Sequence, residues 1–416
     1  MNKKNVFLWS LYDFANSIVS VVFALYFSQW LVIDNKLPDI WYNLIFVGTT
    51  VLLLLTAPIA GSIADKIGLK MPFLTALTLG QFIALLLIGL LTNFISINLG
   101  ILILIIILYM FANYFYQFQF VFYDALLYDI APLKVRGFVS GLGQTANLLG
   151  QIAGLLITLP LISGAVFLIG NPGRAQTFLP ATLIFFLLAL PMLLFFKELT
   201  KPKKISINLL FEYRNSIKNF LALCRVPGVG RYLLGFFFFS DAILTAGINL
   251  PIYLEQVFHI SDRIKAVLVV SFFLTAAIGA AVSGKIADKI GLKRSLLIIL
   301  VCWVFAFPAL SILTNFLHFA VLIQFFGFLY GGTIMATRAV MSYLAPPDKL
   351  TQTFGYFTLF ERFSSFIGPV TWGLITLLLV NTGSLRYQIA LASMTLFVLI
   401  GFILVRSTLS DNKGIQ

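Results

Sequence analysis

Apolar and polar positions follow one another along this chain in long blocks. Runs of about twenty or more mostly apolar residues alternate with short stretches rich in charged residues, Pro, Gly or Asn. Because roughly 20 helical residues cross a hydrocarbon core about 30 Å thick, each run has the length of a membrane span. The pattern predicts twelve helices, at 5–33, 41–64, 71–92, 98–126, 137–165, 177–196, 229–257, 264–287, 294–314, 317–343, 352–380 and 386–406.

The number of spans depends on one boundary and on the nature of the first run. If the boundary between 294–314 and 317–343 is misplaced, the number of spans is eleven. The first run follows Lys3 and Lys4, extends past Trp30 and lacks a cleavage site of small residues, which predicts a retained span and not a signal peptide.

Polar residues interrupt several runs at spacings of three and four, which places them on one helical face. An ionisable group inside a membrane costs about 2.5–3.5 kcal/mol on insertion scales, so each is a candidate functional residue. Hydrogen bonding between helices is the alternative explanation of such faces. The candidate substrate- or ion-binding residues are Asp13, Asn16, Ser17, Asn113, Gln117, Asp124, Gln144, Asn147, Gln151, Asp241, Asn249, Glu361 and Arg362.

Three of these residues are candidates for proton coupling. Asp13, Asp241 and Glu361 can each take up a proton from one side of the membrane and release it to the other. Glu361 is followed by Arg362, so a structural ion pair is an equal alternative there. The sixth, ninth and twelfth runs are apolar nearly all round, which favours contact with lipid.

Composition supports an integral membrane protein, since 60% of the residues are hydrophobic, 10% are charged and the mean hydropathy is +1.01. The net charge of +13 is explained by topology. With both termini in the cytoplasm, 22 of the 28 basic residues fall in cytoplasmic segments, as the positive-inside rule requires. Nucleic-acid binding is therefore not expected.

A long basic segment divides the chain into halves. Residues 197–228 contain a stretch at 207–224 with apolar residues at helical spacing, which predicts an amphipathic helix on the membrane surface. The predicted organisation is a six-helix bundle at 1–196, this linker, and a second six-helix bundle at 229–416.

The two halves share a repeat. GSIADKIGLK at 61–70 and GKIADKIGLK at 284–293 agree at nine of ten positions and follow the second span of each half. Such duplication indicates a transporter in which two bundles move about a central site. We expect Gly61 and Gly284 to allow close helix approach and Asp65 and Asp288 to cap neighbouring helices, with the other gating residues being Lys66, Gly68, Lys70, Lys289, Gly291 and Lys293. Ordinary positively charged loops are the alternative.

The decapeptide resembles the hallmark loop of the major facilitator superfamily, and both halves keep it. LYDFANS at 11–17 resembles the signature of the vacuole-effluxer-like family, whose eukaryotic members are linked to autophagy and vacuolar amino-acid export. Residues 122–144 and 331–346 resemble further parts of that family, with Arg338 at the family's Arg position. The resemblance implies two pseudo-symmetric bundles, with the first, fourth, seventh and tenth spans lining a cavity.

This chain departs from the family at three positions. Asp124 replaces the usual Asn, Tyr128 replaces Pro, and Ile334 stands near a usual Gln. If those positions contact substrate, the cargo differs from the best-known one of the family.

Other chemistries lack a basis in the sequence. GAAVSGKI at 279–286 has no Ser or Thr after its Lys and no preceding strand, so it is not a phosphate-binding loop. The two Cys and two His residues form no ligand or nucleophile pattern, so we expect no metal, no cofactor and no enzymatic activity.

The sequence thus predicts a monomeric secondary transporter, coupled to protons or another ion, in a bacterial inner membrane. By resemblance its substrate is an amino acid or a similar small polar metabolite, with efflux favoured. A carrier of an amphipathic cargo such as a lysolipid, and a membrane receptor that does not transport, are the alternatives.

Overall fold

The computed structural model describes residues 3–131, 133–168, 173–198, 228–344 and 363–408, with 214, 218, 221–222, 224–226, 357 and 360–361. All regular elements in these residues are helical. Eleven of the described helices are long and apolar enough to cross a membrane. The predicted all-α membrane fold is confirmed.

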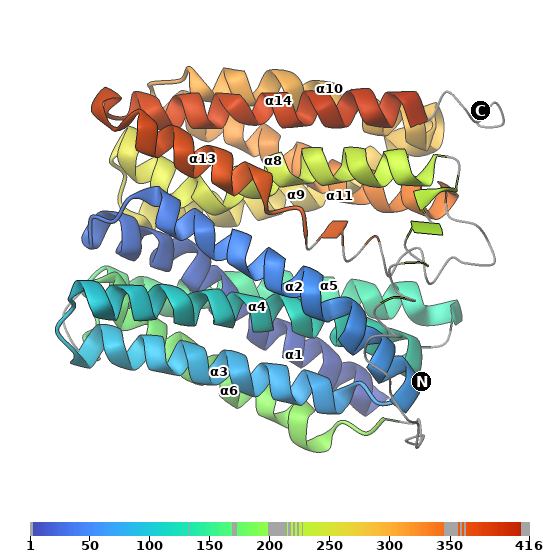
Figure 1. The fold of residues 1–416 in the computed structure, drawn as a ribbon, viewed down its shortest axis with the longest axis horizontal. Coiled ribbons are helices and arrows are strands. Elements are labelled where there is room, and N and C mark those ends of the chain that lie inside the picture. Colours follow the sequence, from blue (N-terminus) through green and yellow to red (C-terminus); the bar gives the residue numbers. More distant parts are fainter. Residues whose placement is uncertain are drawn as a thin grey trace. The chain divides into compact units, whose positions relative to one another are not determined.

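The chain forms two compact units, one of Met1–Leu37 and Gly48–Ser216 and the other of Pro38–Val47 and Ile217–Gln416. The first six helices are α1 (Lys3–Val22), α2 (Asp39–Ile67), α3 (Met71–Phe94), α4 (Leu99–Ile130), α5 (Leu133–Ile162) and α6 (Phe178–Phe195). The later ones are α8 (Val229–Phe258), α9 (Asp262–Ile290), α10 (Leu292–Ser311), α11 (Phe316–Leu344), α13 (Ile367–Leu378) and α14 (Leu385–Thr408) (Figure 1).

The twelve predicted spans correspond to these helices with one difference. Helices α10 and α11 are separate, so the alternative of eleven spans based on that boundary is wrong. The predicted span 352–380 contains α13, which has 12 residues, preceded by the non-helical residues 364–366. Most of 352–362, and most of the predicted linker helix at 207–224, lie outside the described residues.

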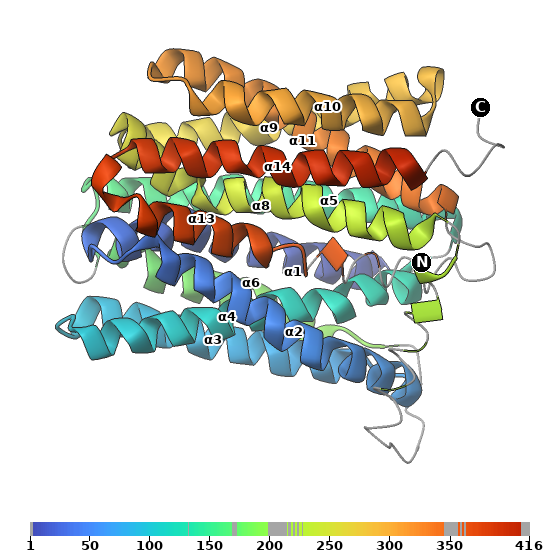
Figure 2. The same cartoon turned by 45° about the horizontal axis from the view of Figure 1, so that its top comes forward.

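Small residues set the packing of helices within each unit. In the first unit α1 packs along α5, and a Cβ on Gly150 would lie 2.3 Å from the carbonyl oxygen of Phe14. In the second unit α9 packs along α11, and α10 lies beside α14 (Figures 1 and 2). A Cβ on Gly331 would lie 1.8 Å from the carbonyl oxygen of Ala276. Close backbone approach of this kind is typical of membrane helices.

Helix ends follow local chemistry. Gly68 after α2 and Gly291 after α9 have φ values of 78° and 90°, a conformation that favours glycine. The first turn of α3 is capped by Glu198, whose carboxylate accepts bonds from the backbone amides of Lys70 at 2.7 Å and Met71 at 3.1 Å. A carboxylate there also interacts favourably with the helix dipole.

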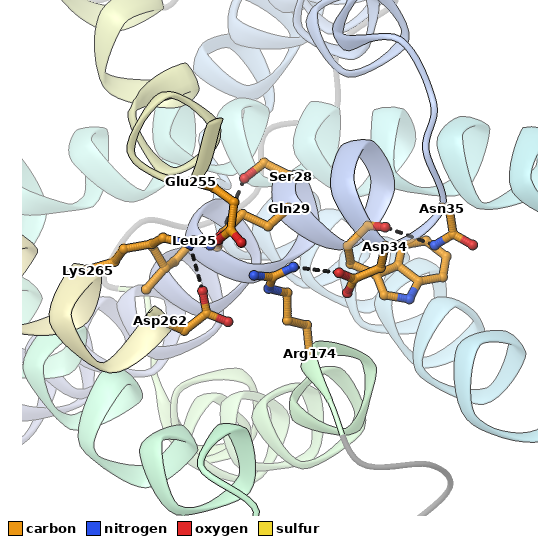
Figure 3. A network of polar contacts seen from close by, with 10 residues as sticks. Leu25, Ser28, Gln29, Asp34, Asn35, Arg174, Glu255, Asp262 and Lys265 are labelled. Carbon is orange, nitrogen blue, oxygen red and sulfur yellow. Dashed lines mark hydrogen bonds and ion pairs between the residues drawn. The ribbon is translucent and has the colours of Figure 1, made fainter. Parts of the chain in front are cut away.

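The first span continues beyond α1 as two π-helical turns, Phe23–Phe27 and Trp30–Asp34. The Leu25 carbonyl in the first turn accepts hydrogen bonds from the side chains of Ser28 and Gln29 (Figure 3). Wider π turns are often found at functional positions of helices. Here they end a span whose earlier turns carry Asp13.

Charged residues near the span ends are paired within each unit. In the first unit Arg174 forms an ion pair with Asp34 at 2.5 Å (Figure 3). In the second unit Lys265, whose side chain is fully buried, forms ion pairs with Glu255 and Asp262 (Figure 3). A buried ammonium group needs such partners, because its desolvation costs several kcal/mol.

Candidate functional site

The first unit contains a buried polar cluster on four helices, here called the α1 cluster. Its members share a position on the inner faces of α1, α3, α4 and α5, and hydrogen bonds link most of them. They are the buried Tyr12, Asp13, Asn16, Ser17, Thr78, Gln81 and Gln119, with the half-buried Asn147 and Gln151.

Gln119 is the centre of one half of this cluster. Its amide nitrogen donates to Gln81 at 2.7 Å and to Asn16 at 3.2 Å, while its carbonyl oxygen accepts from Tyr12 and Thr78. The side chain is fully buried and uses both ends of its amide. Gln119 therefore fixes the orientation of α1 residues from α4.

Asp13 belongs to the other half of the cluster. The side-chain amide of Asn147 on α5 donates to Asp13 Oδ1 at 2.9 Å, and Gln151 donates to Asn147 Oδ1 at 2.7 Å. The result is a relay of amides that ends on a buried carboxylate.

Two buried donors of the α1 cluster have no hydrogen-bond partner. Asn16 Nδ2 and Ser17 Oγ are each on residues that are 1% exposed, and neither makes a bond in the described structure. A buried donor left unsatisfied costs about 1–3 kcal/mol, so a water molecule or a ligand group is the expected partner.

Aromatic residues close one side of the cluster. Trp9 and Tyr123 stack with ring centroids 4.6 Å apart, and each donates a hydrogen bond to the other's backbone carbonyl. These bonds tie α1 to α4 and hold Tyr12 against Tyr123.

The second unit has its own buried carboxylate. Asp241 on α8 is fully buried, and its Oδ2 accepts a 2.7 Å bond from the backbone amide of Gly368. Thr245 donates to Oδ1 at 3.4 Å. Asp241 thus caps α13 at the point where the helix begins after the break at 364–366.

Next to Asp241, two asparagine amides bond reciprocally. Asn249 and Asn43, both fully buried within the second unit, exchange hydrogen bonds of 2.9 and 3.1 Å. Neither amide nitrogen depends on this pair alone, because Asn43 also donates to the Asp39 carbonyl and Asn249 to that of Thr245.

We expect Asn249→Leu to lower the free energy of unfolding by about 1–3 kcal/mol, because it leaves the Asn43 amide oxygen buried without its donor. Thermal unfolding in detergent measures the effect. The double variant Asn43→Leu/Asn249→Leu should recover part of the loss. A double variant whose loss equals the sum of the single losses would show that the pair does not interact energetically.

A sequence model described as Major Facilitator Superfamily matches residues 7–369, and again 232–414, which together cover nearly the whole chain. The chain belongs to the Major Facilitator Superfamily. The predicted membership is confirmed.

Curated relatives within the superfamily include an uncharacterized MFS-type transporter, YxiO, of Bacillus subtilis, which is 23% identical over 95% of this chain and 93% of its own. Autophagy-related protein 22 of Pichia angusta is 26% identical over 40% of this chain and 32% of its own length. The proton-coupled antiporter flippase LtaA of Staphylococcus saprophyticus is 29% identical over 38% of this chain and 40% of its own. The likeness to the vacuole-effluxer family is confirmed by the second match.

Solved structures show the same superfamily fold. An inward-facing bacterial homolog of the human lysosomal transporter Spinster has a TM-score of 0.76 at 13% identity and covers 99% of both chains. The nucleoside transporter NupG has a TM-score of 0.74 at 10% identity and covers 98% of this chain and 100% of its own. At these identities the likeness shows the fold alone.

The other predicted binding residues differ in how far they are buried. Asn113 is half-buried on α4 and donates to Thr49 at 3.4 Å, and Gln117 is half-buried on the same helix. Asp124 and Gln144 are exposed, and Glu361 is half-buried. Arg362 lies outside the described residues, so the proposed Glu361–Arg362 pair stays a prediction.

The second repeat loop begins at Gly284. Among the described residues, a Cβ on Gly284 would meet no atom within 4 Å, so the expected close helix approach at Gly284 stays a prediction. On α9 a close approach is found at Gly279, where a Cβ would lie 2.0 Å from the Phe328 carbonyl oxygen. The side chains at Gly61, Asp65, Lys66 and Asp288 lie outside the described part of the chain.

Of the remaining predicted gating residues, Lys70 makes defined contacts. Lys70 forms a 2.6 Å ion pair with Asp129 and donates to the Ala125 carbonyl, which ties the start of α3 to the end of α4. Lys289 and Arg338 are exposed and Lys293 is half-buried. Their gating role stays a prediction.

Sequence reasoning missed four members of the α1 cluster, Tyr12, Thr78, Gln81 and Gln119, and the bordering Trp9. Thr78 and Gln81 are three residues apart in the predicted span 71–92, and this spacing was the available signal. Among the described residues, no three His, Cys, Asp or Glu side chains could hold a metal ion together.

Proposed function

We propose that this superfamily member is a secondary transporter that works by alternating access and couples substrate movement to protons. The observation that carries the proposal is the α1 cluster, in which Asp13 is buried within a membrane span and receives its 2.9 Å bond from the neutral amide of Asn147. A carboxylate in such a setting is retained at high cost, which argues for a function in ion or proton transfer.

The proposed cargo is an amino acid or a similar small polar metabolite, with efflux favoured. Two observations support this cargo. The chain partly matches autophagy-related protein 22, and the α1 cluster contains amide and hydroxyl groups that can bind a polar molecule. The unpartnered Asn16 Nδ2 and Ser17 Oγ can donate to a carboxylate or carbonyl oxygen of a polar cargo. We place both termini in the cytoplasm of a bacterial cell, on the distribution of basic residues.

An amphipathic cargo is the second candidate. The match to LtaA, named a proton-coupled antiporter flippase, covers 38% of this chain, and stacked aromatic residues border the α1 cluster. Both candidates share a proton-coupled mechanism and differ in the size and polarity of the cargo.

We expect purified protein in liposomes to move at least one labelled amino acid or small polar metabolite, with faster flux when a pH gradient is imposed. Flux of a labelled lysolipid in the same vesicles is the parallel measurement. Movement of the lysolipid without movement of any metabolite would replace the first cargo with the second. Absence of flux for every compound would contradict transport and favour a receptor.

A further inference from the structure

A cavity of about 700 Å³ lies where α3 begins and α6 ends, away from the α1 cluster. Leu79, Leu193 and Phe196 form part of its apolar wall, and Lys197 and Glu198 stand at its polar end. Both helices reach the limit of their apolar spans here. The cavity therefore combines a hydrocarbon-like wall with a charged rim at the depth of the membrane–water boundary.

The cavity opens on a surface that is rich in exposed apolar side chains. Leu79 on α3 is 40% exposed. On α6, Leu194 and Phe195 follow the lining residue Leu193 and are 68% and 54% exposed. In a membrane span, a surface of this kind faces lipid. Lipid chains are therefore the molecules that reach the apolar wall.

The rim has an excess of positive charge. The Glu198 carboxylate bonds two amides of the first turn of α3, at 2.7 and 3.1 Å, which neutralises part of its charge. Lys197 is exposed, and Asn5 donates to its carbonyl at 3.1 Å, which holds the start of α1 at this site. Lys4 Nζ lies 5.5 Å from the ring centroid of Phe195.

The described rim thus carries the ammonium groups of Lys197 and Lys4 beside a Glu198 carboxylate that two backbone amides partly neutralise. Basic pockets between membrane helices bind anionic headgroups.

We propose that this cavity binds an anionic phospholipid, with an acyl chain along Leu79 and Phe196 and the phosphate near Lys197 and Lys4. A volume of about 700 Å³ is within the usual range for small-molecule sites, which is about 300–1,000 Å³. Because the rim is basic, a lipid with net negative charge is favoured over a zwitterionic lipid of the same chains. The cavity shares no lining residue with the α1 cluster, so the inference does not depend on the proposed function.

The test is native mass spectrometry of the full chain released from detergent, titrated with phosphatidylglycerol or phosphatidylcholine of identical chains. We expect the first lipid to bind with a dissociation constant lower by about fivefold or more, the effect of one or more lysines near the headgroup. Lys197→Gln and Lys4→Gln should each reduce this preference, because each removes one ammonium group from the rim. Lys289→Gln removes an exposed lysine from α9 and should leave the preference unchanged.

Ala76→Trp tests the apolar wall without removing charge, since Ala76 lines the cavity and is exposed. It should weaken both lipids together while the lipid-free protein keeps its melting temperature. Equal binding of the two lipids by the native chain would overturn the proposal. Loss of the preference in Lys289→Gln to the same degree as in Lys197→Gln would overturn it as well.

Discussion

Asp13→Asn is expected to reduce substrate accumulation driven by a pH gradient to the background level of empty liposomes. An asparagine cannot take up or release a proton at neutral pH, so the coupling step is lost. The substitution keeps the shape of the side chain, and the new amide oxygen can still accept the 2.9 Å bond from Asn147 Nδ2. We therefore expect the free energy of unfolding to change by no more than about 1 kcal/mol.

The measurement is uptake of the labelled substrate found in the panel, with and without the gradient, in matched vesicles. Asp34→Asn is the control, because it removes a carboxylate from the same span at its exposed end, where Asp34 pairs with Arg174. This control should keep gradient-driven uptake. Retention of the gradient effect in Asp13→Asn would exclude Asp13 as the coupling residue, and counterflow exchange in the variant would show that the cargo still binds.

Asp241 is the less discriminating position for this experiment. Its two oxygens accept bonds from Gly368 N and Thr245 Oγ1, and an amide has only one acceptor oxygen. Asp241→Asn would therefore leave a donor facing an NH₂ group and weaken the cap of α13. Loss of transport in that variant would therefore have two physical explanations, loss of a titratable group and loss of the helix cap.

The spans were predictable from the sequence because the bilayer fixes their length and their polarity. The polar faces were predictable where one helix alone determines them. Asp13 and Asn16 are three residues apart on α1, and Asn147 and Gln151 are four residues apart on α5. The hydrogen bonds that connect these polar faces depend on tertiary structure. The 2.9 Å bond between Asn147 and Asp13 depends on how closely α1 and α5 approach, and periodicity does not report this.

Gln119 could not be predicted as a site residue from the sequence of α4 alone. The predicted polar face of α4 contains Asn113, Gln117 and Asp124, and Gln119 is two residues from Gln117, so it points to a different side of the helix. The structure makes that side the buried one, where Gln119 bonds to Gln81 and Asn16. In an apolar span the buried face of α4 depends on the neighbouring helices, and the residue pattern of a single span does not identify them.

Substitution of Gly331 in the second unit is expected to have a large effect on stability. We expect Gly331→Ala to lower the free energy of unfolding by about 1–3 kcal/mol or more, because an added Cβ would lie 1.8 Å from the Ala276 carbonyl oxygen and 2.9 Å from the Ala280 nitrogen. Both atoms belong to the α9 backbone, so the strain cannot be relieved by rotating a side chain. The two helices must move apart along their length, which also removes their packing contacts.

Gly284→Ala is the matched control on the facing helix. The repeated motif singles out Gly284, yet a Cβ there would meet no atom of the described residues within 4 Å. Alanine also has the higher helix propensity, by up to about 1 kcal/mol. The control should therefore keep or slightly raise the melting temperature in detergent, while Gly331→Ala lowers it. If the two variants melt at the same temperature, α9 and α11 do not approach at Gly331 as described. If Gly284→Ala is the less stable variant, the motif glycine has the packing role that the sequence first predicts for it.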